Sequence, residues 1–75
     1  MLRANIYIRA FDADGEAQEF TCYHYNADGI KNKDFKKQVK NDKLDIAERY
    51  CADTGFDFSQ VLSLDFEDVE DDDYF

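Results

Sequence analysis

The amino-acid sequence predicts a small α+β domain with the element order β-β-α-β. Residues 4–11 and 17–25 alternate between two sets of side chains, as half-buried strands do. Residues 34–52 carry apolar side chains at helical spacing, and residues 61–66 alternate again. A chain of 75 residues forms one domain with a small core. We therefore expect a three-stranded, mainly antiparallel sheet packed against a helix, because three strands alone bury too little.

The first two strands are predicted to form a hairpin. In residues 4–11, Ile6, Ile8 and Ala10 share one face. The segment 12–15 has turn chemistry, with two aspartates that bond local backbone and a glycine that accepts positive φ. In residues 17–25 both faces carry aromatic side chains, so the sequence leaves open which one is buried. The face with Tyr23 and Tyr25 is a candidate contact surface.

The predicted helix has an interrupted apolar stripe. Phe35, Val39, Ile46 and Tyr50 lie on one face, but Asp42 and Lys43 stand where the next apolar residue is due. The segment is therefore either one helix with a polar middle or two short helices that meet near Asn41. Gly55 is the predicted left-handed cap.

The third strand completes the sheet. Leu62, Leu64 and Phe66 are predicted to share one face, opposite Val61, Ser63 and Asp65. The first strand is the most aliphatic, so we place it in the centre, in the order 2-1-3. This gives a single domain over residues 1–69 and an acidic carboxyl-terminal tail over 70–75.

Net charge narrows the classes of partner. The chain carries a formal charge of −9 at pH 7, which argues against direct binding to nucleic acid or to an anionic membrane and favours a protein with a basic surface. Residues 1–8 lack an apolar run, and no segment is apolar enough for a membrane span. We therefore expect a cytoplasmic protein.

The chemistry-bearing residues do not indicate catalysis. Cys22, His24 and Cys51 include no C-x-x-C pair, so we expect two reduced, mostly buried thiols and no zinc site. A calcium loop that begins at Asp12 would place Gly at position four and Tyr23 at twelve, which the EF-hand pattern does not allow. A chain of this size also has little volume for a deep cleft. The sequence therefore predicts no enzyme, no metal and no cofactor.

The carboxyl-terminal segment carries the main candidate binding residues. From Asp65 onward, seven of eleven residues are Asp or Glu, and none is Lys or Arg. A solvated tail that keeps the protein soluble is one interpretation; an anionic strip for a basic surface is the other. The residues of that strip are Asp65, Glu67, Asp68, Glu70, Asp71, Asp72, Asp73, Tyr74 and Phe75. A secondary set, on or beside the hairpin, is Asp12, Asp14, Glu16, Tyr23 and Tyr25.

In size, composition and this charge run, the chain resembles the DNA-mimic proteins that phages use against restriction and CRISPR nucleases. The resemblance rests on no shared motif. It implies an inhibitor that competes with nucleic acid for a basic groove of its target, with rapid and salt-sensitive association.

The last five residues suggest an alternative. Asp71-Asp72-Asp73-Tyr74-Phe75 resembles the carboxyl-terminal tip of bacterial single-stranded DNA-binding proteins, although Tyr74 stands where that family has Ile-Pro. The resemblance implies that Phe75 and its carboxylate engage DNA-repair or replication proteins.

A basic block precedes this acidic end. Residues 31–43 contain six lysines and two aspartates. They form either a solvated helix face, a neutralising surface for the chain's own tail, or a phosphate site that lacks the interleaved aromatic residues stacking needs. Pairing of the third-strand edge with a second copy is a further alternative, so both a monomer and a homodimer stay open.

Overall fold

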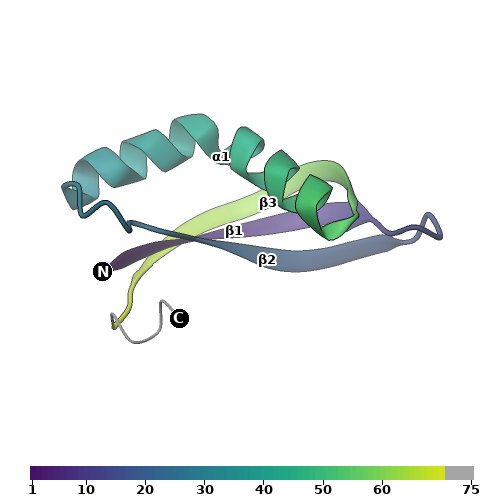
Figure 1. Ribbon diagram of the computed structural model, residues 1–75, viewed down its shortest axis with the longest axis horizontal. Helices are drawn as coiled ribbons and strands as arrows, with labels where there is room; N and C mark the ends of the chain where they lie inside the picture. Colours follow the sequence, from purple (N-terminus) through teal and green to yellow (C-terminus); the bar gives the residue numbers. More distant parts are fainter. Residues whose placement is uncertain (71–75) are drawn as a thin grey trace.

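The computed structural model of the chain, which describes residues 1–70, confirms the predicted α+β fold. The elements follow the chain as β1 (Leu2–Phe11), β2 (Ala17–Tyr25), α1 (Asn32–Thr54) and β3 (Asp57–Asp68). The strands form one antiparallel sheet in the order β2-β1-β3. α1 crosses one face of this sheet and leaves the other face open (Figure 1).

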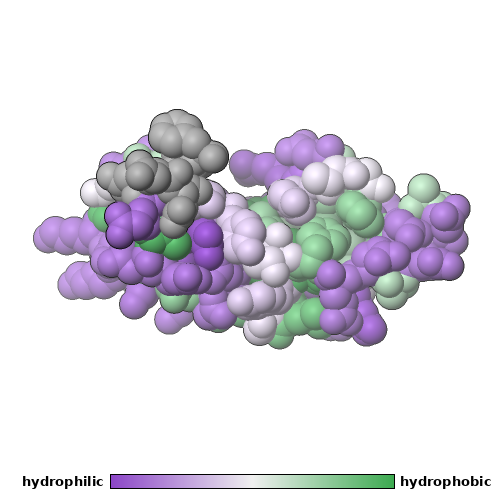
Figure 2. All heavy atoms as spheres, turned by 90° about the horizontal axis from the view of Figure 1, so that it is seen from below, coloured by the Kyte–Doolittle hydropathy of each residue, from purple (hydrophilic) through white to green (hydrophobic). Residues whose placement is uncertain are grey.

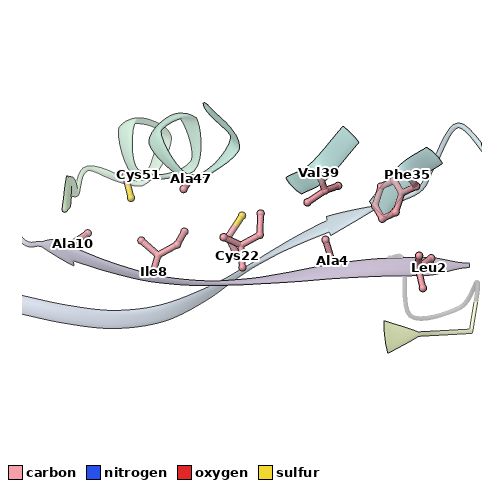
Figure 3. Close-up of a cluster of buried hydrophobic side chains, with 10 residues drawn as sticks. Leu2, Ala4, Ile8, Ala10, Cys22, Phe35, Val39, Ala47 and Cys51 are labelled. Atoms are coloured by element: carbon pink, nitrogen blue, oxygen red, sulfur yellow. The ribbon is translucent and has the colours of Figure 1, made fainter. Parts of the chain in front are cut away.

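β1 forms the floor of the core. Its alternate residues Leu2, Ala4, Ile6, Ile8 and Ala10 are all buried. They meet side chains that α1 directs downward, as Figure 3 shows. Burial of these side chains removes apolar surface from water, which stabilises the fold.

β2 turns its Phe20, Cys22 and His24 face toward the helix. Ile6 pairs with Cys22 in the ladder, and Asn5 pairs with Tyr23. Because neighbouring side chains in paired strands share a face, Tyr23 and Tyr25 lie on the open side. α1 packs mainly on β3 and β1, so Phe20 and His24 are only half-buried.

α1 is one continuous helix of 23 residues. Its buried positions are Phe35, Val39, Ala47 and Cys51. Lys43 occupies the vacant place in this stripe and is half-buried; a lysine at such a position covers apolar surface with its aliphatic stem. The polar middle therefore does not divide the helix.

The end of α1 matches the prediction for Gly55. Gly55 has a φ of 83°, in the left-handed region, and the Phe56 N–H donates to the Cys51 carbonyl at 2.9 Å. This is the Schellman arrangement, which ends a helix and directs the chain away from its axis. It delivers Phe56 to the edge of the core.

β3 departs from the predicted alternation. Leu64 pairs with Ile6, Val61 with Ile8 and Phe58 with Ala10. Two residues of β1 are thus matched by three residues of β3 in each interval, so β3 contains two bulges of one extra residue each. The expectation was right for Leu64 and Phe66, which pack against the core, and wrong for Val61 and Leu62. Val61 packs inward, whereas Leu62 is 44% exposed. A β-bulge shifts the phase of the side chains by one residue, which explains this exchange.

The central position of β1 leads to a stability prediction. Replacing Ile6, which is fully buried, with valine removes one methylene from the middle of the core. We expect the free energy of unfolding to fall by about 0.5–1.5 kcal/mol. Leu44→Ala, at a helix position that is 54% exposed, is the control and should stay within about 0.5 kcal/mol. Urea denaturation measures both; equal effects would contradict the proposed core.

Candidate protein-binding face

The open face of the sheet gathers polar and aromatic side chains in cross-strand rows. The ladder aligns Tyr25, Arg3 and Glu67 in one row and Tyr23, Asn5 and Asp65 in the next. Figure 2 views the molecule from this side: a pale, near-neutral band and an apolar area lie between hydrophilic ends. We call these six residues, together with Tyr7, the open-face network.

Arg3 connects the first two rows. Its Nη2 lies 3.0 Å from Glu67 Oε1, and its Nε donates to Asn5 Oδ1 at 2.9 Å. Its guanidinium carbon is 4.3 Å from the centre of the Tyr23 ring, within cation–π range. Hydrogen bonding with Tyr25 and the charge of Glu67 raise the pKa of Arg3, although burial opposes them. Arg3 is therefore held by partners in three directions.

Asp65 holds the middle of the network. Its Oδ1 accepts a hydrogen bond of 2.7 Å from Asn5 Nδ2, and its Oδ2 accepts one of 3.0 Å from the Tyr7 hydroxyl. The hydrogen bond to Asp65, and secondarily burial, raise the pKa of Tyr7. Asn5 is 5% exposed, and its amide has a partner on both sides. The network therefore fixes these side chains before any partner arrives.

The structure brings only part of the predicted site together. Asp65, Glu67, Tyr23 and Tyr25 meet on the open face. Asp68 points to the other side of β3, where its Oδ1 lies 3.3 Å from the Met1 amine. Glu70 follows the strand and is exposed. Asp71, Asp72, Asp73, Tyr74 and Phe75 lie outside the described residues.

The secondary acidic residues lie at the opposite end of the sheet, in the β1–β2 turn (Figure 1). Asp12 organises that turn: Oδ1 accepts from the backbone N–H of Asp14 and of Glu16, both at 2.9 Å, and Oδ2 accepts from Gln18 Nε2 at 3.0 Å. The hydrogen bond from Glu16 is the main reason that the pKa of Asp12 is lowered. Asp14 and Glu16 are exposed.

Sequence reasoning did not select Arg3, Asn5 and Tyr7. The available signal was their position in the first strand, where they alternate with the aliphatic residues that are predicted to be buried and therefore point to the opposite face. Because a polar residue on an outward phase is ordinary for a half-buried strand, the pattern alone could not distinguish a network from a solvated surface.

Grooves between α1 and β2 surround His24. One, of about 390 Å³, is lined by His24, Tyr25 and Phe35, and a second, of about 330 Å³, by His24 and Asp42. The His24 ring is stacked parallel to Phe35 at 5.9 Å. Within residues 1–70, no group of three or more His, Cys, Asp or Glu is arranged to hold a metal ion.

The two cysteines are free and buried. Burial raises the pKa of Cys22 to about 11 and raises that of Cys51 as well. Both thiols therefore stay protonated at neutral pH, whereas a nucleophilic cysteine requires the thiolate.

No family model, no curated protein and no solved structure matches this chain. No helix within residues 1–70 combines the length and apolar character that a membrane span requires. A functional interpretation therefore depends on the geometry of the open face and of the grooves.

The open-face network can be tested through Asn5. Asn5→Ala removes the amide between Arg3 and Asp65, and with it two hydrogen bonds of about 0.5–1.5 kcal/mol each. We expect a loss of about 1–3 kcal/mol in urea denaturation. Asn41→Ala, at an exposed helix position, should change stability by less than about 0.5 kcal/mol. An Asn5→Ala variant as stable as the parent would show that the network does not support the fold.

His24 gives a prediction about pH. Burial lowers the pKa of His24, and the negative charge of the nearby Asp42 partly offsets this effect. In the unfolded chain the pKa of histidine is about 6.5. The unfolded chain therefore binds the proton more readily than the folded protein does. The stability that neutral His24 contributes is complete above about pH 6.5 and is lost as pH falls through the lower pKa of the folded state. In denaturation experiments between about pH 7 and 5, the parent should lose stability relative to His24→Phe. Parallel curves for the two proteins would contradict the lowered pKa.

Proposed function

We propose that this protein is a non-catalytic binding protein whose open sheet face docks on a basic surface of another protein. The supporting observation is the unequal charge of its two layers. The sheet and its hairpin turn carry eight carboxylates and two arginines, whereas α1 carries six basic and five acidic side chains. The sheet layer is therefore the more negative of the two, and it places Asp65 and Glu67 on its open face.

The two arginines do not reverse this character. Arg3 is paired with Glu67 at 3.0 Å, and Arg9 is paired with Glu19 at 3.4 Å. Both cations are thus matched by carboxylates on neighbouring strands, and the excess of acidic groups repels phosphate. A protein partner with a basic surface fits this field better than nucleic acid does.

The tyrosines add a contact surface that charge alone does not provide. Tyr23 is 53% exposed, and Tyr7 and Tyr25 lie half-buried in the same network. Tyrosine is enriched in protein interfaces because a flat, stiff ring buries much area at a small entropic cost. The network holds Tyr7 and Tyr23 through Asp65 and Arg3, which reduces the cost of ordering them on binding.

The finer form of the proposal is a nucleic-acid mimic. Asp65 and Glu67 follow each other at about 6.6 Å along one face of a strand, next to tyrosine rings that can occupy the place of bases. Together with the resemblance in size and charge to phage DNA-mimic inhibitors, this supports competition for a nucleic-acid-binding groove. The bulges in β3 interrupt its free edge, which disfavours pairing with a second copy.

The test removes two charges from one layer at a time. Asp65→Asn with Glu67→Gln retains the side-chain shapes on the open face, and Asp45→Asn with Glu48→Gln makes the same charge change at exposed positions of α1. Each variant is used to capture proteins from host lysate at low and high salt, and the captured partner is quantified by mass spectrometry. The open-face variant should recover about 2- to 30-fold less of the partner than the parent does. The helix variant should retain it.

Added duplex DNA should not bind the protein itself. If the protein mimics nucleic acid, however, the DNA should compete with it and displace it from the captured partner. Recovery that is insensitive to salt and equal for both variants would contradict docking by the open face. Recovery that depends on the open face but resists DNA would contradict only the mimic.

A further inference from the structure

A second surface lies where the carboxyl-terminal end of α1 passes over the edge strand β2. It is a groove of about 550 Å³, within the size range of ligand pockets. Its lining includes Phe20, Tyr50, Thr54, Phe56, Asp12 and Glu19. It exists because α1 packs mainly on β3 and β1, so the helix side of β2 is incompletely covered.

Three aromatic rings form the apolar wall of this groove. The Phe20 ring lies 5.7 Å from Tyr50 and 5.0 Å from Phe56, both tilted by 44°. Tyr50 is 37% exposed, and Phe20 and Phe56 are half-buried. Phe56 is placed here by the Schellman cap at Gly55. The wall is thus anchored to the fold while part of its surface faces solvent.

Carboxylates stand on the rim. Asp12 and Glu19 line the groove. Asp12 is held in place by its hydrogen bonds within the turn and keeps its charge. Glu19 forms an ion pair with Arg9, with 3.4 Å between Oε2 and Nη2. Aromatic walls beneath an acidic rim match a side chain with an apolar stem and a cationic head.

We infer that this groove binds an arginine or lysine side chain from a basic peptide segment of a protein partner. The aliphatic stem packs on Tyr50 and Phe56, and the cation lies near the ring faces and the rim carboxylates. This inference does not rest on the proposed function, because the groove lies on the helix side of β2 and uses neither Asp65 nor Glu67.

The experiment titrates the isotope-labelled protein with the acetylated, amidated tripeptide Leu-Arg-Leu and follows backbone amides by NMR. We expect saturable shifts at Phe20, Thr54 and Phe56. The matched peptide with citrulline, which has nearly the same shape but no charge, should bind at least about 5-fold more weakly. Higher salt should reduce the affinity of the arginine peptide and not that of the citrulline peptide.

Variants separate this groove from other surfaces. Tyr50→Ala should weaken binding by at least about 5-fold, and Leu44→Ala, on the same helix but outside the groove, should not. Glu19→Gln, at an exposed position, gives a second test that spares the core. Equal binding of the two peptides, unchanged binding by both groove variants, or shifts confined to Tyr23 and Asp65 would overturn the inference. The last result would assign the peptide to the open face instead.

Discussion

β1 has both edges hydrogen-bonded and both faces in use, and the rest of the structure depends on it. Its inward side chains are the floor of the core, and its outward side chains Arg3, Asn5 and Tyr7 organise the open face. The two roles are coupled through strict alternation, because a shift of one residue would exchange them. Among the strands within residues 1–70, β1 is the one with a hydrogen-bonded neighbour on each side.

The two layers of the molecule consequently differ in chemistry. α1 covers one side with a nearly balanced set of charges, while the sheet layer is strongly acidic. On the open face, part of this acidity is held by internal partners: Asn5 and Tyr7 bond Asp65, and Arg3 pairs with Glu67. Such a surface holds ordered tyrosines beside carboxylates, and the proposed docking on a basic protein depends on this combination.

The position of α1 also accounts for the grooves. A helix that leans toward β3 and β1 leaves the helix side of β2 partly uncovered, and the residues there are aromatic or titratable rather than aliphatic. Phe20 and His24 thus become walls of surface grooves instead of core. At the hairpin end, the cap at Gly55 adds Phe56 to this wall, and the turn adds Asp12.

Local pattern and turn chemistry determined the element order, the central place of the first strand, the hairpin turn and the end of the helix at Gly55. Each of these depends on neighbours within a few residues or on one aliphatic strand, which is information the chain itself carries. Tertiary structure alone decided which aromatic face of β2 is buried, how the bulges in β3 exchange Val61 and Leu62, and that Asp65 bonds Asn5 and Tyr7. Those outcomes depend on how strands distant in sequence align, and the free energies that choose between registers arise only when the strands pack together.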